Sequence, residues 1–280
     1  MRRPDLHLHT TASDGQYEVW QVARMAQRAD VTLFAVTDHD TMAALPEAAD
    51  AAYERGLAFL PGVEISAAVE ESNVHVLGYG VNPDDPVLTA FFQRMRADRI
   101  IRIARMGEKL ADMGIVLPME EIFNSAGDSV GRPHLARAMV KRGYAGDTGE
   151  AFHLYLKRGR PAYVKRNLPT AAEAIALLKE RGAVPVVAHP GEIRLPMERI
   201  IQLLDEWKKA GLKGLEVYHP ANRGHYAEWD RLARQRGLLV TGGSDFHGDG
   251  ANHGSLGETI PEWPTALSDA WALYRTVKNH

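Results

Sequence analysis

Seven short apolar segments of this chain end in a histidine or a carboxylate, and this repetition limits the folds that the chain can adopt. The segments end in Leu6-His7-Leu8-His9, Asp38-His39-Asp40, Val63-Glu64, Val74-His75, Ala188-His189, Tyr218-His219 and Asp245-Phe246-His247. Alternate residues of an extended strand point to the same face, so the imidazoles of His7 and His9 can reach one metal ion. We therefore expect a fold that gathers the ends of its strands in one place.

Helices separate most of these segments, which predicts an α/β fold with a largely parallel sheet. The expected strands cover residues 3–10, 32–38, 57–66, 74–79, 184–188, 214–218 and 238–242, and the fourth pairs with the third as a hairpin. The expected helices between and after them cover residues 17–30, 42–55, 170–182, 196–210, 223–236 and 264–278. Because active sites of α/β barrels lie at the carboxyl ends of the strands, ligand-type residues at these ends favour a closed barrel over an open sheet.

Residues 83–168 interrupt this alternation and are predicted to form a helical insertion, with helices near 87–113, 118–125, 132–142 and 148–156. The barrel would then consist of residues 1–82 and 169–280, and the insertion would cap the substrate. Residues 82–168 hold 15 Lys and Arg against 10 Asp and Glu, whereas the remainder holds 18 against 26. A basic segment on an acidic body predicts attraction for an anion, although a solvated helix surface would have the same composition.

Composition excludes several kinds of site. The chain has no cysteine, so any metal must be bound by nitrogen and oxygen. It also lacks a Gly-x-Ser-x-Gly elbow and a P-loop. No apolar run approaches the ~18 residues that span a bilayer, and no signal peptide is visible after Met1. We expect a cytoplasmic protein with no membrane attachment and no obligate protein partner.

Imidazole and carboxylate side chains at the strand ends would share one pocket. The expected set is His7, His9, Asp14, His39, Glu64, His75, His189, Asp245 and His247. Without cations, several carboxylates in one cavity would repel one another and take up protons. A divalent ion takes about three or four protein ligands plus water, so this set is large enough for two or three ions.

The motifs resemble those of the PHP (polymerase and histidinol phosphatase) family of metal-dependent phosphoesterases, within the amidohydrolase superfamily. They are Asp5-Leu6-His7-Leu8-His9-Thr10, Thr37-Asp38-His39-Asp40-Thr41, Gly62-Val63-Glu64-Ile65-Ser66, Ala188-His189-Pro190 and Ser244-Asp245-Phe246-His247. The resemblance covers residues 1–82 and 169–257, where the motifs occur in the family's order. It implies an enzyme with a distorted, TIM-like (βα)7 barrel and a trinuclear metal centre.

Carried over position by position, the resemblance implies three metal sites. The first would use His7, His9, Glu64 and Asp245, the second Asp14, His39 and His247, and the third Glu64, His75 and a histidine of the insertion, for which His134 is the candidate. Relatives with a histidine in the second site differ from this chain, where Asp14 must serve. The added carboxylate favours a harder ion, so we expect Mn²⁺ over Zn²⁺, with Fe²⁺ or Mg²⁺ as alternatives.

Three more strand-end residues lie beside these ligands in the sequence. Asp38 and Asp40 flank His39 and could orient a ligand imidazole from behind. His219 ends a strand and could either bind a metal or lie behind a ligand. These alternatives stay open at the level of the sequence.

The position of the insertion, the Gly-Arg-Pro-His motif and the length resemble the family branch that contains 3′,5′-nucleoside bisphosphate phosphatases and 5′→3′ exoribonucleases. This implies hydrolysis of the 3′-phosphate of a 3′,5′-nucleoside bisphosphate, giving a nucleoside 5′-monophosphate and phosphate. One alternative is 5′→3′ exonuclease action on short RNA. Others are histidinol-phosphate hydrolysis, which the insertion disfavours, and a non-catalytic module that binds metal.

Candidate catalytic residues are Asp14 and His39, through the second metal site, and His189. The imidazole of His189 titrates near neutral pH and could contact the scissile phosphate or protonate the leaving oxygen. A retained phosphate would suit the planar fork of arginine, and the candidates are Arg99, Arg102, Arg132, Arg160 and Arg194. The alternative is that several of these form surface ion pairs. Phe152 and Tyr163 fit a packing role better than base stacking.

Overall fold

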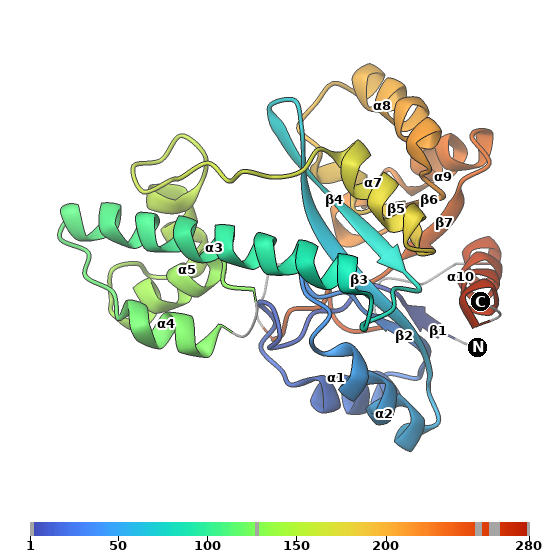
Figure 1. Cartoon of the computed structure of the whole chain (residues 1–280), viewed down its shortest axis with the longest axis horizontal. Helices are drawn as coiled ribbons and strands as arrows, with labels where there is room; N and C mark the ends of the chain where they lie inside the picture. The colour runs from blue at the N-terminus through green and yellow to red at the C-terminus, as the bar shows by residue number, and fades with distance from the viewer. Residues whose placement is uncertain (1–2, 127–128, 250–253, 258–263, 279–280) are drawn as a thin grey trace.

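The computed structural model describes residues 3–126, 129–249, 254–257 and 264–278, and it has one seven-stranded sheet (Figure 1). The strands are β1 (Arg3–Asp5), β2 (Val31–Val36), β3 (Ala58–Val69), β4 (Ser72–Tyr79), β5 (Val184–Val187), β6 (Gly214–Tyr218) and β7 (Leu239–Gly242). They lie in sequence order; β4 pairs antiparallel with β3 and β5, and the other pairs are parallel. The predicted α/β class and the hairpin of β3 and β4 are confirmed.

The first strand is shorter than the predicted residues 3–10, because β1 ends at Asp5. Beyond it, the chain divides its backbone hydrogen bonds between two neighbours instead of pairing continuously with one. Thr37 N–H donates to the Leu8 carbonyl at 2.9 Å, and His9 N–H donates to the Phe246 carbonyl at 3.0 Å. The segment that carries His7 and His9 is therefore held between the ends of β2 and β7.

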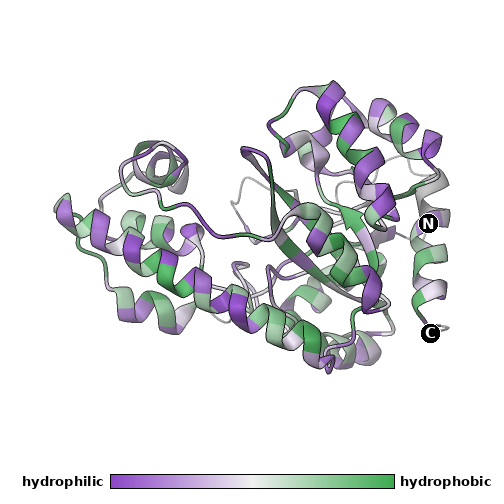
Figure 2. Cartoon of the chain, turned by 45° about the horizontal axis from the view of Figure 1, so that its top comes forward, coloured by the Kyte–Doolittle hydropathy of each residue, from purple (hydrophilic) through white to green (hydrophobic). Residues whose placement is uncertain are grey.

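Helices flank the sheet on two sides (Figure 1). They are α1 (Val19–Arg28), α2 (Leu45–Arg55), α7 (Ala171–Glu180), α8 (Met197–Ala210), α9 (Tyr226–Gln235) and α10 (Pro264–Lys278), with 3-10 turns η2 (Pro190–Glu192) and η3 (Pro220–Asn222). The strands are mostly hydrophobic, whereas the helices alternate hydrophobic and hydrophilic residues (Figure 2). This pattern is typical of helices that bury one face against a sheet. Along the described part of the chain, no helix has both the length and the apolarity to cross a membrane.

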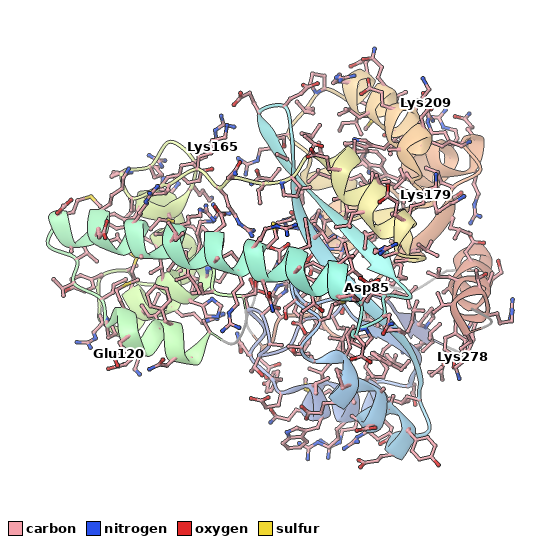
Figure 3. All side chains as sticks on the ribbon, viewed as in Figure 1. Asp85, Glu120, Lys165, Lys179, Lys209 and Lys278 are labelled. Atoms are coloured by element: carbon pink, nitrogen blue, oxygen red, sulfur yellow. The ribbon has the colours of Figure 1, made fainter. Side chains whose placement is uncertain are left out.

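Helices of the middle segment extend away from the sheet (Figure 1). They are α3 (Pro86–Asp112), α4 (Met119–Ser125), α5 (Arg132–Lys141), α6 (Thr148–Ala151) and the π-helical turn η1 (Phe152–Leu156). The Asp85 carboxylate caps α3 by accepting from the N–H groups of Val87 and Leu88. Apolar residues of α3, α5 and η1, among them Ile103 and Leu135, form a hydrophobic cluster of their own. The return segment, which carries Lys165, runs back toward α7 (Figure 3).

Candidate metal centre

The strand ends bring histidine and carboxylate side chains together in four overlapping groups. They are His9 with Asp14, His39 and His247; His7 with His219 and Asp245; His7 with His9 and Glu64; and His39 with Glu64 and His75. Within each group the potential ligand atoms lie within 4.8 Å of one another. We define the metal-ligating rim as His7, His9, Asp14, His39, Glu64, His75, His189, Asp245 and His247; His219 lies against it, beside Asp245.

Glu64, on β3, lies at the centre of the rim and its carboxylate is shared by both sides. Oε2 lies 3.4 Å from His7 Nε2, 3.3 Å from His9 Nε2 and 2.9 Å from His39 Nδ1. Oε1 lies 2.8 Å from His75 Nδ1 and 3.0 Å from His189 Nε2. The side chain of Glu64 is only 1 % exposed. Because its two oxygens face different imidazoles, this carboxylate is suited to binding more than one cation.

Two aspartates complete the rim on the other side. Asp245 Oδ1 lies 3.2 Å from His7 Nε2 and 3.1 Å from His9 Nε2. Asp14 Oδ1 lies 3.2 Å from His247 Nε2, and Asp14 Oδ2 lies 4.0 Å from His39 Nε2. The two imidazoles at alternate positions, His7 and His9, therefore do face the same carboxylates.

Backbone conformations at the rim are unusual for residues with side chains. Asp40, His189 and Asp245 have φ values of 53°, 24° and 54°. Such left-handed conformations cost free energy and persist where the surrounding structure imposes them. Close approach also requires glycine at position 243, where a Cβ would lie 2.4 Å from His7 N. The end of β7 can thus approach His7 closely enough to place Asp245 beside it.

Asp38 fixes the loop that carries Asp14. Its Oδ1 accepts from Thr10 N–H at 2.8 Å and from the Ser13 hydroxyl at 2.5 Å, and its Oδ2 accepts from the Thr10 hydroxyl at 2.7 Å. None of these contacts is with an imidazole, so Asp38 orients the backbone of the loop. Deeper in the fold, Asp5 Oδ1 accepts from Ser244 N–H at 2.8 Å and holds the turn before Asp245.

Burial and neighbouring opposite charges shift the pKa values of the rim residues in opposite directions. Burial alone would lower the pKa of His7, but Glu216, Asp245 and Glu64 raise that pKa well above its usual value. Burial alone would raise the pKa of Glu64, but His39, His75 and His7 hold it well below its usual value. The same balance, with His247 and His39 as partners, lowers the pKa of Asp14. The carboxylates therefore stay ionised inside the protein, as cation ligands must.

The donor set fits divalent cations. Several buried atoms lack a hydrogen-bond partner among the described residues: His7 Nε2, His9 Nε2, Asp14 Oδ1, His39 Nδ1 and Glu64 Oε2. Buried polar atoms are rarely left unpaired, because each loses its hydration without compensation. These atoms converge on shared points and are nitrogen and oxygen only, which is the ligand chemistry of zinc, manganese or iron.

The histidine expected from the insertion is not part of these four groups, although the charge of the rim residue Asp14 still acts on it. Among the described residues His134 belongs to none of the four groups, and its Nδ1 accepts a hydrogen bond from Gly131 N–H at 3.1 Å at the start of α5. Burial and the charge of Arg137 lower the pKa of His134 to about 4. His189 instead reaches this side of the rim, since its Nε2 lies 3.2 Å from His75 Nδ1.

Sequence reasoning missed Glu216 altogether. This buried carboxylate on β6 lies 2.9 Å from His7 Nδ1 through Oε1, and its Oε2 accepts from His189 N–H at 2.8 Å. A carboxylate behind a ligand imidazole fixes the tautomer and orientation of the ring. A single glutamate inside the apolar strand Gly214–Tyr218 was the signal that could have revealed it.

Asp40 joins the rim to the middle segment. Its Oδ2 accepts from Arg99 Nε at 2.8 Å and Arg99 Nη2 at 2.6 Å, and it lies 3.0 Å from Arg166 Nη1. Its Oδ1 accepts from Ser66 N–H at 2.8 Å, two residues beyond Glu64. Burial alone would raise the pKa of Asp40, but the charges of Arg99 and Arg166 hold it far below its usual range. Arg99 was expected to contact substrate, but most of its N–H groups donate to Asp40 and Ser66. The second arginine at Asp40, Arg166, was not predicted from the sequence.

Two of the predicted arginines lie close together without a carboxylate. Arg102 donates through Nε to the Val164 carbonyl at 2.8 Å and packs on the Tyr163 ring, and Arg132 packs on the Phe152 ring. Burial and the charges of Arg132 and Arg166 lower the pKa of Arg102 to about 9. Burial also lowers the pKa of Arg132, as do the charges of Arg99 and Arg194. We call Arg102, Arg132 and Arg194 the arginine group; within the described chain none forms an ion pair. Arg194 and Arg160 are both exposed, but the charge of Arg194 lowers the pKa of Arg132, whereas Arg160 is not among the charges that act on Arg132.

Proteins of similar sequence hydrolyse phosphate esters. The chain is 33 % identical over 264 residues to a 3′,5′-nucleoside bisphosphate phosphatase of Chromobacterium violaceum, covering 92 % of each chain. It is 32 % identical over 272 residues to a 5′-3′ exoribonuclease of Haemophilus influenzae, covering 94 % of this chain and 98 % of the relative. It also matches the 5′-3′ exoribonuclease Rnm of Escherichia coli at 32 % identity, over 98 % of this chain and 94 % of the relative.

Solved structures agree with these similarities. An amidohydrolase of Chromobacterium violaceum with bound sulfate and no metal superposes with a TM-score of 0.88 at 31 % identity, covering 97 % of this chain and 96 % of the other. A protein of Bifidobacterium adolescentis, assigned as a metal-dependent phosphoesterase, gives 0.87 at 31 % identity over 98 % and 96 %. The sequence-family model of the PHP domain matches residues 5–218 of this chain. The chain therefore belongs to the PHP family, and it is a metal-dependent phosphoesterase.

Proposed function

We propose that the protein is a phosphomonoesterase that removes the 3′-phosphate of a 3′,5′-nucleoside bisphosphate. The observation that supports this proposal is a rim of potential cation ligands close to a group of arginines that, among the described residues, form no ion pair. The metal-ligating rim suits the phosphate that is hydrolysed, and the arginine group suits a phosphate that is retained. A substrate with one phosphate would use only the first.

Arg99 connects the two arrangements. Its positive charge acts on both: it opposes the rise in the pKa of His39 that Glu64 and Asp14 cause, and together with burial it lowers the pKa of Arg132. Arg102 and Arg132 are half-buried, and partly desolvated guanidinium groups without a carboxylate are unfavourable unless an anion compensates them. The planar fork of arginine binds phosphate through two parallel hydrogen bonds. The retained phosphate would supply the missing negative charge.

The residues of the rim would hold two or three divalent ions. His7, His9, Glu64 and Asp245 form a first site, Asp14, His39 and His247 a second, and Glu64, His75 and His189 a third. When bound, such ions lower the pKa of water and offset the negative charge on the phosphoryl oxygens. We place His189 among the ligands because its Nε2 shares Glu64 Oε1 with His75. The third carboxylate, Asp14, favours Mn²⁺ among the candidates.

Two structural proposals accompany the function. Leu6 N–H donates to the Gly242 carbonyl at 3.2 Å, and Asp245 N–H donates to the His7 carbonyl at 2.9 Å. These bonds join the first and last strands and support a distorted, closed (βα)7 barrel. The separate hydrophobic cluster of the middle helices supports a capping domain of residues 83–168, with the barrel formed by residues 1–82 and 169–280.

Action on short RNA from the 5′ end is a second candidate. Two of the relatives are named 5′-3′ exoribonucleases and match almost their whole length. Successive nucleotides stack well on aromatic rings, but Phe152 and Tyr163 already pack against Arg132 and Arg102. The same arginine group would then bind a phosphate of the strand. This activity is compatible with hydrolysis of the bisphosphate at the same centre.

Phosphate release from matched substrates tests the proposal. Purified, Mn²⁺-loaded protein would be given adenosine 3′,5′-bisphosphate, adenosine 5′-monophosphate, histidinol phosphate and a short 5′-phosphorylated oligoribonucleotide. We expect kcat/KM to be highest for the bisphosphate and the product to be the 5′-monophosphate. Faster turnover of the oligoribonucleotide would favour the exonuclease, and a preference for either monophosphate would contradict the role of the arginine group.

A further inference from the structure

We propose that His219 is not a metal ligand and that its Nε2 donates a hydrogen bond to a non-bridging oxygen of the phosphoryl group undergoing hydrolysis. This inference rests on the proposed phosphatase function. His219 follows β6 and is 2 % exposed. Its Nε2 lies 3.3 Å from Asp245 Oδ2, yet it has no hydrogen-bond partner among the described residues. Distance alone would place this nitrogen among the metal ligands.

The hydrogen bond at the other ring nitrogen argues against ligation. Ala221 N–H donates to His219 Nδ1 at 3.1 Å, at the start of the turn η3. In a neutral imidazole one nitrogen accepts and the other carries the proton. Because Nδ1 accepts from a backbone amide, which can only donate, the proton lies on Nε2. A protonated Nε2 has no lone pair for a cation, and it is a donor.

Two histidines of the rim, His7 and His247, have the opposite arrangement at Nδ1. His7 Nδ1 faces the Glu216 carboxylate at 2.9 Å, and His247 Nδ1 faces the carbonyl of Asp245 at 2.8 Å. These partners can only accept, so Nδ1 carries the proton and Nε2 keeps the lone pair that a metal ion requires. His134 shares the arrangement of His219, since its Nδ1 accepts from Gly131 N–H. The partner at Nδ1 thus distinguishes His219 from His7 and His247, whose Nε2 atoms face the carboxylates of the rim.

The position of His219 suits a contact with the reacting phosphate. Its ring lies 5.0 Å from that of His189 and 5.8 Å from that of His7, measured between centroids. Asp245 places one carboxylate oxygen near His219 and the other beside His7 and His9. A phosphoryl group held at the rim would therefore have an oxygen within reach of Nε2. A fixed neutral donor at this point stabilises the charge that builds up during hydrolysis.

The first test measures the tautomer and metal binding without using catalysis. Two-bond ¹H–¹⁵N spectra of the Zn²⁺-loaded, histidine-labelled protein should show His219 protonated at Nε2. His219→Leu and His219→Gln should retain as many zinc equivalents as the wild type, with an unchanged affinity in a competition with a chelator. His9→Leu, which removes a rim ligand, is the control that should lose metal. A zinc-bound Nε2, a lost equivalent or a tenfold weaker affinity would overturn the proposal.

The second test uses inorganic phosphate as the probe, so that its outcome does not depend on the nucleotide substrate. We expect His219→Leu to weaken phosphate binding to the Zn²⁺-loaded protein about tenfold and to lower kcat/KM for the bisphosphate about 10²-fold, the effect of losing one such donor. His219→Gln, whose amide can donate, should recover part of both losses. Unchanged phosphate binding in His219→Leu would contradict the donor role. If the wild-type protein did not hydrolyse the bisphosphate, that result would contradict the proposed function and not the role of His219.

Discussion

The metal-ligating rim and the arginine group both concentrate ionisable side chains, but they balance charge in different ways. In the rim each carboxylate faces several imidazoles, so opposite charges meet within the protein. In the arginine group like charges lie together, with Arg102 and Arg132 over aromatic rings, and burial lowers the pKa of these two arginines. This difference supports the proposal that the rim holds cations and the arginine group an anion, and Asp40 with its arginine partners connects the two regions.

The largest effect is expected from Glu64→Gln, which changes the carboxylate shared by both sides of the rim. Loss of the negative charge removes a ligand from more than one site, so we expect the loss of at least one metal equivalent and a decrease in kcat of more than about 10³-fold. Elemental analysis and phosphate release measure these changes. Glu206→Gln, at an exposed ion pair with Arg199, is the matched control and should behave as wild type. Full metal content in Glu64→Gln would contradict a shared bridge.

Next in size is Asp40→Asn, which tests the connection between the two regions. Two buried guanidinium groups would lose their counter-charge, so the free energy of unfolding should fall by about 3 kcal/mol or more. Denaturant titration measures the loss. Asp98→Asn is the control, because Asp98 contacts only Arg166 of this pair and its side chain is 33 % exposed. Equal stability of the two variants would show that the connection is not stabilising.

A smaller effect is expected from Glu216→Gln, which keeps the shape behind His7 but removes the charge. Changes of this kind typically lower metal affinity about 10- to 100-fold, because the ligand ring is less basic and less well oriented. Competition with a chelator of known affinity would measure this decrease. The expected signature is weaker binding at full stoichiometry. If a metal equivalent were lost outright, Glu216 would itself be a ligand.

The smallest effect distinguishes the arginine group from other arginines of the middle segment. Arg132→Gln should raise KM for the bisphosphate about tenfold, the value of one charge-assisted contact, and leave hydrolysis of p-nitrophenyl phosphate unchanged. Arg160→Gln should change neither, because Arg160 is not among the charges that act on Arg132. Steady-state kinetics on both esters decide this. An equal rise in KM for the two variants would remove the distinction.

The strand ends could be predicted because their geometry is local. Period-two spacing determines that His7 and His9 share a face, and β-strand order then brings Glu64, Asp245 and His247 to the same rim. The contacts of the middle segment depend on pairs far apart in the chain. Arg99 reaches Asp40 across 59 positions, and Arg166 has no motif around it. The helical spacing of Arg99 with other arginines suggested a phosphate ligand. In the structure, however, its guanidinium group is paired with the Asp40 carboxylate.

The roles of individual histidines were harder to predict than their positions. Gly131-Arg132-Pro133-His134 has the composition of a ligand motif, but His134 Nδ1 caps the start of α5. His219 and His189 both follow a strand and precede a proline, yet their Nδ1 atoms face different partners. Sequence indicates that an imidazole is present, and only the hydrogen bond at the second nitrogen determines which atom carries the proton.

A count of bound cations tests the central claim most directly. Protein purified without chelators, loaded with Mn²⁺ and freed of excess metal would be analysed for metal content per chain. A shared rim of these residues predicts two or three equivalents, and Glu64→Gln should bind fewer. Fewer than two equivalents in the wild-type protein would contradict the account, because so many buried imidazoles and carboxylates would then face one another without the cations that explain their arrangement.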